Sequence, residues 1–438
     1  MTWAPLLVLF LGSLVFLIFI GVPVAFGFLI VNMVAMWILI GFDAGTKTLV
    51  VGALDSLAKF SLAPVPLFIF MGEILYQSGC VTKTLDALDR LLGRIPGRLS
   101  ILSVMAGTAF AVTSGSSIAN TSMLGSLLVP EMRRRGYSTT MTVGPILASG
   151  SLAMIIPPSG VAVILGSVGE ISIGDLLLGG VVPGLIMAAG FFALIVVRCM
   201  INPSLAPRYE VVEVPLAQKI YAFVFHVLPL ALVIVPVLGA ILLGIATPTE
   251  SAAIGVVGAL LVALGSLRLS WSVFSRAVTE TVRLSSMILM IVALAIGFSQ
   301  ALTYSGATRS LIASITSLNV SAELIVVLML GIVIFLGMFL ELVAIILITI
   351  PLFIPILTNY QIDPVWFGLM MLVCLDIGQL TPPVGMLLLV MKGAVPRDIT
   401  LEQIVRSAIP FIMVEFCIVL LIYFWPSVAL WLPSLQQN

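Results

Sequence analysis

Small hydroxyl side chains gather in one short segment of this very apolar chain. Residues 111–126 read AVTSGSSIANTSMLGS and combine serines, threonines, an asparagine and two glycines. Uncharged hydroxyl and carbonyl oxygens suit a hard monovalent cation. Zinc and copper do not fit, because the four cysteines are scattered and the only histidine, His226, is interpreted as a hydrogen-bonded packing residue. The segment therefore predicts a Na⁺ site, with close helix packing by small residues as the alternative.

Basic residues on both sides indicate how this segment enters the membrane. Three arginines precede it and three follow it: Arg90, Arg94, Arg98, Arg133, Arg134 and Arg135. Because basic residues mark cytoplasmic loops, both ends of residues 99–132 are expected in the cytoplasm. A single crossing cannot place them there, whereas a re-entrant helical hairpin broken at TSGSS can. Non-helical backbone at membrane depth must be buried in protein or line a wet cavity, and the hydroxyls lie at that break.

Three other segments are predicted to be broken, and together with the first tip they form two pairs, one in each half of the chain. Prolines in SGSLAMIIPPSG (149–160) and CLDIGQLTPPVG (374–385) remove backbone donors and clash with the preceding turn, so they predict unwinding in mid-membrane. The stretch FLGMFLE (335–341) lies at the tip of a second predicted hairpin, 322–357. Unwinding frees carbonyl groups that suit Na⁺, and it exposes helix N-termini that suit carboxylates.

Acidic residues inside apolar spans are rare and often functional. A shift of about 225 residues relates Glu341 to Ser116, so Glu341 falls at the second tip. There it could help to hold a cation, or it could be a solvated acid near the periplasmic mouth. Asp376 lies near the second proline break and could satisfy unwound backbone donors. Glu131 and Glu415 are interpreted as boundary or inter-helix residues.

The composition is that of a membrane protein. The chain has 438 residues, of which 61% are hydrophobic and 9% charged, whereas soluble domains carry about 25% charged residues. Its apolar runs reach the roughly 20 residues that cross a bilayer, and no GxxxxGK[ST] nucleotide-binding motif is present. Spans are expected at 5–20, 22–41, 62–79, 138–168, 176–197, 221–244, 250–266, 284–304, 365–391 and 404–425.

The basic residues also orient these spans. With the 99–132 hairpin included, 16 of the 19 basic residues fall on one side, and only Lys47, Lys59 and Arg309 fall on the other. The crowded side is predicted to be cytoplasmic. Both termini are therefore predicted to lie in the periplasm, with the chain in the inner membrane of a bacterium.

The chain repeats itself at a distance of about 225 residues. Three pairs of stretches show this: ILYQSG (74–79) with ALTYSG (301–306), LLVPEM (127–132) with LFIPIL (352–357), and MIIPPSG (154–160) with GQLTPPVG (378–385). Each half then holds five spans and one hairpin, and an odd number of crossings turns the second half upside down. The predicted fold is an all-α polytopic membrane protein of two inverted repeats, with a transport site at the midplane.

Two further segments are typical of arms at the membrane surface. Residues 82–99 are amphipathic and basic, and residues 306–320 are their counterpart in the second repeat. They could brace a moving hairpin domain, or they could be plain interfacial anchors. The predicted division is scaffold 1–61, transport and arm elements 62–197, linker and scaffold 198–283, and transport and arm elements 284–438.

Three motifs carry a family resemblance. The stretches SGSSIANTSMLGSLLVPEMRRRGY, GIATPTESAAIGVVGAL and CLDIGQLTPPVGMLLLV resemble the large membrane subunit of tripartite ATP-independent periplasmic (TRAP) transporters. The likeness extends over essentially the whole chain, from GVPVAF near its start to the last span. It implies an elevator-type transport domain, import of small organic acids driven by Na⁺, a separate four-helix membrane subunit and a soluble periplasmic binding protein. Membrane lipid is the surrounding medium, and neither an organic cofactor nor a nucleic-acid partner is expected.

The resemblance also implies site residues. One Na⁺ site would use Ser116 and Asn120 with carbonyls around Gly150 and Ser151, although relatives often have threonine at the Asn120 position. A second site would use Gly337, Glu341, Gly378 and Thr381. The substrate would lie between the tips, near Ser114, Ser117, Pro158 and Pro383.

Two other functions are compatible with the same pattern. A self-sufficient elevator symporter of Na⁺ and an anion would need no binding protein. A channel is the third reading, because hairpin pairs and half-helix dipoles also occur in pores. No motif supports an enzyme.

Overall fold

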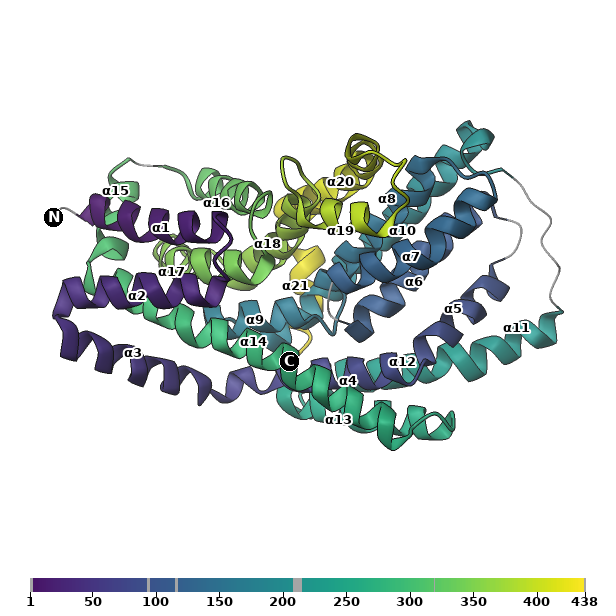
Figure 1. Ribbon diagram of the computed structural model, residues 1–438, viewed down its shortest axis with the longest axis horizontal. Coiled ribbons are helices and arrows are strands. Elements are labelled where there is room, and N and C mark those ends of the chain that lie inside the picture. Colours follow the sequence, from purple (N-terminus) through teal and green to yellow (C-terminus); the bar gives the residue numbers. More distant parts are fainter. Residues whose placement is uncertain (1–2, 93–94, 115–116, 208–214, 319, 437–438) are drawn as a thin grey trace.

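The computed structural model describes residues 3–92, 95–114, 117–207, 215–318 and 320–436, and all regular secondary structure within them is helical (Figure 1). The longer helices up to residue 201 are α1 (Trp3–Phe19), α2 (Val24–Ile40), α3 (Phe42–Leu57), α4 (Pro64–Gln77), α5 (Cys80–Leu91), α6 (Arg98–Ser114), α7 (Ser117–Arg134), α8 (Thr139–Ile155), α9 (Gly160–Gly169) and α10 (Ile173–Ile201). Those that follow are α11 (Leu216–Ala222), α12 (Leu228–Leu242), α13 (Pro248–Gly265), α14 (Trp271–Tyr304), α15 (Ala307–Ser317), α16 (Ala322–Gly337), α17 (Leu342–Asn359), α18 (Pro364–Gln379), α19 (Met386–Ala394), α20 (Leu401–Phe424) and α21 (Ser427–Ser434).

The helices form two groups that pack against each other. Helices α2, α3, α4, α12, α13 and α14 contact one another in a strip along the lower edge of Figure 1. The second group contains α6 to α10 and α16 to α21, with α8 in contact with α6, α7, α10, α18 and α20. The short helix α5 contacts α4 and α6, and α15 contacts α14 and α17, so each short helix joins the two groups.

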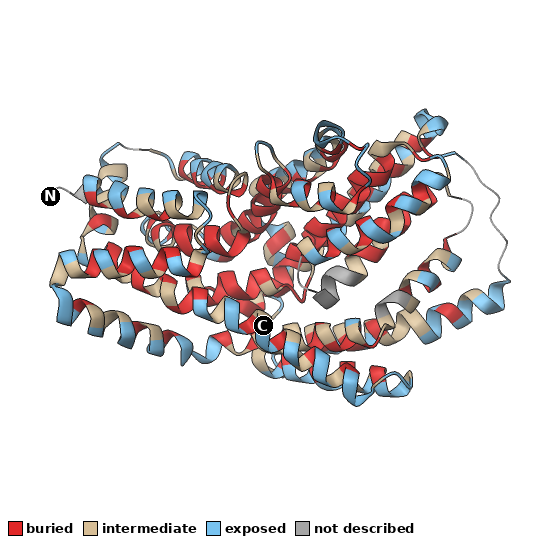
Figure 2. Ribbon diagram, viewed as in Figure 1, coloured by how far each residue is buried: buried red, intermediate tan, exposed pale blue. Residues whose placement is uncertain are grey.

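The most completely buried helices lie in the second group. Every residue from Met141 to Ile155 of α8 is buried, and α18 is buried along almost its whole length (Figure 2). Both helices are apolar all round, and a helix of this kind is stable only when other helices enclose it. Helices α3 and α13 lie at the edge and leave many apolar side chains exposed, as expected where a helix faces lipid.

Both predicted hairpins are present as antiparallel helix pairs. The backbone N–H of Leu99, at the start of α6, donates to the hydroxyl of Tyr137, just after the end of α7, at 3.3 Å. In the second pair, the start of α16 and the end of α17 line one cavity of about 430 Å³, through Ala322 and Tyr360 among others. The two ends of each pair therefore lie together, while the depth of the tips in a bilayer stays a prediction.

The order of elements recurs in the two halves of the chain. Gly79 precedes α5 with φ 68° and Gly306 precedes α15 with φ 69°, a left-handed conformation that glycine adopts without steric cost. Each short helix is followed by a hairpin, and each hairpin by a helix that ends before a double proline. This recurrence matches the offsets in the sequence, and the inverted orientation of the second half stays a prediction.

The proline breaks are shorter than predicted. Helix α8 continues through Gly150 and Ser151 and ends at Ile155, so only residues 156–159 are non-helical before α9. In the second half α18 continues through Asp376 and Gly378 to Gln379. A proline restricts mainly its own position and the residue before it, so helix can persist until shortly before the proline pair. The carbonyls of Gly150 and Ser151 thus belong to a helix rather than to an unwound segment.

Three helical segments were not predicted. Residues 42–57 form α3. Its charged residues Asp43, Lys47 and Asp55 interrupt an otherwise apolar run, so the segment was not recognised as a helix. The span predicted at 284–304 begins earlier, at Trp271, because the Ser270 hydroxyl caps α14 by accepting from the N–H of Val273 at 3.2 Å. A final short helix, α21, follows the last predicted span.

The chain is a multi-pass membrane protein. Within the described residues, seven helices are long and apolar enough to cross a membrane, and the bent pair α8 and α9 would make eight. Most of the predicted spans are among them, and so is α17 of the second hairpin. Helices α1, α2 and α18 belong to a class of shorter apolar helices.

The first hairpin makes a topological prediction. Cysteines introduced at positions 95 and 136, in a chain without its native cysteines, should react with a membrane-impermeant maleimide from the same, cytoplasmic side. The Leu99–Tyr137 contact supports this expectation, because it holds the two ends of the pair together. Labelling in right-side-out and inside-out vesicles is the measurement. Reaction of the two positions from opposite sides would contradict a re-entrant hairpin.

Candidate functional site

The first hairpin tip is fastened to the middle of α8. The Ser117 hydroxyl donates to the carbonyl of Gly150 at 3.1 Å. The side-chain amide of Asn120 donates to the carbonyls of Gly107 and Ser149, at 3.2 and 3.1 Å. The structure thus brings Asn120 next to Gly150, which the resemblance placed at one Na⁺ site, and it also brings Ser117, expected at the substrate, to the same carbonyl. Ser116 lies outside the described residues, as does the side chain of Ser114 at the end of α6.

Among the described residues of this tip, two oxygens are buried without a hydrogen-bond partner. They are the amide oxygen of Asn120 and the hydroxyl of Thr121, on residues that are 1% and 0% exposed. The Thr121 hydroxyl lies against α8, 3.3 Å from where a Cβ on Gly150 would stand. Buried polar atoms are normally paired, so these oxygens fit an oxygen-coordinated cation. Thr121 was not selected from the sequence, although it lies inside the hydroxyl cluster beside Asn120.

The second hairpin tip packs on the end of α18 by backbone contact. A Cβ on Gly337 would stand 2.8 Å from the Cα of Gly378, so only glycine allows this approach. The N–H of Gly385 donates to the carbonyl of Met338 at 3.0 Å and ties the tip to the proline turn. Thr381 is on the same turn, where its N–H donates to the carbonyl of Gly378 at 3.0 Å. The structure thus brings Gly337, Gly378 and Thr381 together, as the sequence predicted.

Glu341 has a different setting from these three residues. It is the N-cap of α17, where one carboxylate oxygen accepts from the N–H groups of Val343 and Ala344 at 3.1 and 3.4 Å. The carboxylate thereby satisfies backbone donors that the start of a helix leaves unpaired. It also lines the cavity between the two helix groups, beside Leu342 and Val343.

Residues of both hairpin tips line that cavity. It has a volume of about 510 Å³ and is lined by the first residues of three helices: Ser117 and Ile118 of α7, Gly160 and Val161 of α9, and Leu342 and Val343 of α17. Pro158 also lines it, whereas Pro383 is exposed and does not. Helices α2, α4 and α14 contribute the opposite, apolar wall.

The cavity offers helix starts that could bind an anion and walls that are mostly apolar. Helix N-termini carry partial positive charge and free N–H groups, and the starts of α2, α7, α9 and α17 line the cavity. The charged side chain among the described lining residues is the acid Glu341. No lysine, arginine or histidine is among the described lining residues. Its volume lies within the range of pockets that hold small organic ligands.

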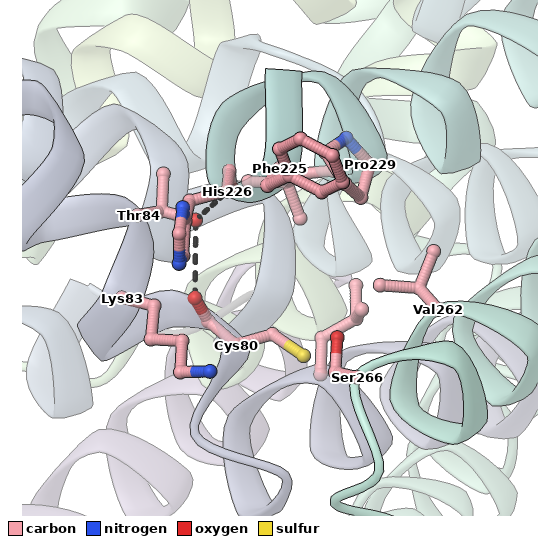
Figure 3. Close-up of a pocket in the computed structure, with 10 residues that line it drawn as sticks. Cys80, Lys83, Thr84, Phe225, His226, Pro229, Val262 and Ser266 are labelled. Carbon is pink, nitrogen blue, oxygen red and sulfur yellow. Dashed lines mark hydrogen bonds between the residues drawn. The ribbon is translucent and has the colours of Figure 1, made fainter. Parts of the chain in front are cut away.

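A second cavity, around His226, is too small for such a ligand. Cys80, Lys83 and Thr84 of α5 face Phe225 and His226 across a space of about 20 Å³, which has room for a single water (Figure 3). The Thr84 hydroxyl donates to the backbone carbonyl of His226 at 2.7 Å. The imidazole Nδ1 is buried without a hydrogen-bond partner within the described chain, and the packing role of this side chain stays a prediction.

The arrangement of the helices is one that solved membrane transporters share. The fold agrees with solved transporters: the YdaH transporter of Alcanivorax borkumensis superposes with a TM-score of 0.64 at 16% identity, covering 88% of this chain and 90% of that one. MtrF of Neisseria gonorrhoeae, from a class of antimetabolite efflux pumps, superposes with a TM-score of 0.61 at 12% identity, covering 92% and 94%.

Comparison of sequences identifies the family. The model of the "Tripartite ATP-independent periplasmic transporter, DctM component" matches residues 11–428. The chain is 31% identical over 401 residues to the C4-dicarboxylate TRAP transporter large permease protein DctM of Pseudomonas aeruginosa, covering 91% of this chain and 92% of the relative. It is 30% identical over 428 residues to the isethionate TRAP transporter permease protein DctMQ of Oleidesulfovibrio alaskensis, covering 97% of this chain and 66% of the relative. The chain therefore belongs to the large membrane subunits of TRAP transporters, and its relatives are named as permeases rather than enzymes.

Proposed function

We propose that this subunit imports a small organic acid together with Na⁺, by an elevator movement of the hairpin-containing helix group. In this proposal a periplasmic binding protein delivers the acid and a small membrane subunit supports the scaffold. The observation that carries the proposal is the cavity of about 510 Å³ at which the helix starts of both hairpins meet.

The chain's own groups would hold the acid in a definite orientation. The N-termini of α7 and α9 would bind a carboxylate through backbone N–H groups, with the Ser117 side chain beside them. The N-terminus of α17 is already occupied by Glu341, so it is the least available of the three. The wall from α4 and α14 would contact the apolar part of the ligand.

The first tip fits a coupling ion. The unpaired oxygens of Asn120 and Thr121 are buried, uncharged and next to α8, which is the donor set that a hard monovalent cation requires. When bound, Na⁺ would supply positive charge close to the substrate carboxylate. The contacts of Ser117 and Asn120 with α8 hold the start of α7 at the cavity, so the residues of the ion site also position the anion site.

Partner subunits are supported by the relatives. The match to the isethionate permease DctMQ includes 97% of this chain but only 66% of that relative. The relative's name joins two components. We infer that the remaining third of that relative corresponds to a separate small subunit here. The family's name describes a tripartite periplasmic transporter, which supports a soluble periplasmic binding protein as a third component.

Uptake in proteoliposomes tests the function. The chain and its small subunit would be reconstituted, and labelled dicarboxylates and sulfonates offered with and without a binding protein under an inward Na⁺ gradient. Uptake should require both the binding protein and Na⁺. Uptake without a binding protein would favour the self-sufficient symporter, and flux that does not saturate would favour a channel.

The elevator movement has its own test at the junction of the two helix groups. The Ser167 hydroxyl of α9 donates to the carbonyl of Ser61 at 2.8 Å. The nearby Lys59–Glu170 ion pair is exposed, so it contributes only about 0–1 kcal/mol and does not lock the junction. A disulfide between Ser61→Cys and Ser167→Cys, in a chain without native cysteines, should reduce uptake at least about tenfold if the groups must slide.

Two controls make this result interpretable. Each single-cysteine variant should keep its uptake under the same oxidant, and a reductant should restore the double variant. Full uptake by the crosslinked protein would contradict movement at this junction.

A further inference from the structure

Two acidic side chains are completely buried behind the hairpin tips. Asp376 of α18 and Glu415 of α20 are both 0% exposed. The two carboxyl groups are close enough to interact electrostatically, and the hydroxyl of Ser151 on α8 donates to Glu415 at 2.5 Å. The three helices contact one another in the middle of the second helix group. Glu415 is therefore an inter-helix residue and not a boundary residue, and Asp376 does not satisfy an unwound segment.

Most oxygens of this pair lack a hydrogen-bond partner of good geometry. Both carboxylate oxygens of Asp376 and one of Glu415 are buried without such a partner within the described chain, and the Ser151 hydroxyl that donates to Glu415 also lies close to Asp376. Gln379 is 0% exposed, and neither its amide oxygen nor its amide nitrogen has a partner there. Because Gln379 follows Asp376 by three residues in α18, the two side chains lie on the same face of that helix.

The chain supplies no compensating charge. Among the described residues, no lysine, arginine or histidine forms an ion pair with Asp376 or Glu415. Burying an unpaired carboxylate costs several kcal/mol or more, and such acids within membrane proteins mark ion pathways. One proton shared between the two carboxyl groups would pair only one oxygen of each acid, and it would leave the second Asp376 oxygen and the Gln379 amide unpaired. Carboxylate and amide oxygens are the ligands that a hard cation takes.

We propose that Asp376, Glu415, Gln379 and Ser151 form an additional Na⁺ site, separate from those at the two tips. This inference rests on the proposed Na⁺-coupled function. The separation is visible in the chain: Ser149 and Gly150 accept hydrogen bonds from the first tip, and the next residue, Ser151, donates to Glu415. On α18, Asp376 precedes Gly378, the residue that packs on the second tip, by one half-turn.

The position of the site gives it a role in coupling. A cation between Asp376 and Glu415 holds α8, α18 and α20 together, and α8 and α18 carry the contact surfaces of both tips. Ser151 and Asp376 are also equivalent under the offset of 225 residues that relates the two repeats. The site therefore lies where the repeats meet, and its occupancy sets the surface on which each tip closes.

Direct Na⁺ binding tests the proposal. The purified chain with its small subunit, treated with EDTA, would be titrated with radiolabelled Na⁺ by equilibrium dialysis. The near-isosteric double variant Asp376→Asn/Glu415→Gln should bind one Na⁺ fewer than the unchanged chain. Its Na⁺ activation of uptake should shift to at least about tenfold higher concentration, as for loss of a metal-site residue.

Controls distinguish loss of this Na⁺ site from misfolding and from failure of the proposed Na⁺-coupled function. Gln379→Leu keeps both carboxylates and should weaken Na⁺ binding, and size-exclusion profiles check folding. Glu73→Gln, at an acid of α4 that accepts from Gln77 at 3.1 Å, should bind Na⁺ as the unchanged chain does. An unchanged number of bound ions in the double variant would overturn the inference and leave the tip sites standing. Absence of any Na⁺ binding by the unchanged chain would overturn the proposed function itself.

Discussion

Alanine in place of Gly337 should lower Na⁺-driven uptake at least about tenfold. Its Cβ would stand 2.8 Å from the Cα of Gly378 and 3.2 Å from the carbonyl carbon of that residue. Both obstacles are backbone atoms, so the second tip must move away from α18. Overpacking of this kind costs about 1–3 kcal/mol, and about 1.4 kcal/mol corresponds to a factor of ten in rate. Uptake in proteoliposomes at several Na⁺ concentrations is the measurement.

The same helix provides a matched control. Gly331 lies in α16 as Gly337 does, but a Cβ there would meet nothing within 4 Å. Gly331→Ala should therefore leave uptake unchanged, and it also controls for the higher helix propensity of alanine. If the two variants behave alike, the close approach of Gly337 to Gly378 has no part in transport.

Leucine in place of Asn120 should weaken the Na⁺ activation of uptake and destabilise the first tip. The side-chain amide joins α7 to the carbonyls of Gly107 and Ser149, and leucine leaves both buried carbonyls without that donor. Each buried unpaired polar group costs about 1–3 kcal/mol. The variant also loses the unpaired amide oxygen that we assign to the ion site. We expect the Na⁺ concentration for half-maximal uptake to rise at least about tenfold.

Threonine at the same position separates the two roles of Asn120. Asn120→Thr keeps a side-chain oxygen but loses the reach of the amide donor, so it should lower thermal stability while retaining Na⁺ activation. Melting temperatures with and without Na⁺ would be measured alongside uptake. An unaltered Na⁺ response in Asn120→Leu would show that the amide oxygen is not a ligand, whatever its effect on stability.

The predictions at the two tips test two different attachments of the hairpins, one to α8 and one to α18. Gly337 tests whether the second tip must sit directly on α18, and Asn120 tests whether the first tip combines an ion site with its attachment to α8. Ser117 and Glu341, one from each tip, line the cavity proposed for the acid. Losing either attachment should therefore displace a helix start from that cavity, because the hydrogen bonds and the backbone contact are what hold it there.

Local patterns in the sequence determined the class of protein and much of the site. Long apolar runs predicted the spans, arginines on both sides of residues 99–132 predicted a hairpin, and double prolines predicted the two breaks. These features act over a few residues, so they can be found without a structure. The family resemblance added Ser117, Asn120, Gly337 and Gly378 as candidate site residues, and their binding roles stay predictions.

Tertiary structure decided what depends on residues far apart in the chain. Helix α3 forms against α2 and α14 in spite of its charges, which no local pattern indicates. The cavity exists only because the starts of α7, α9 and α17 converge. Glu415 is 39 residues from Asp376 and 264 from Ser151, and its sequence context is that of an ordinary acid on a long helix. Only the packing of α8, α18 and α20 buries all three residues and leaves oxygens of Asp376 and Glu415 without a hydrogen-bond partner among the described residues.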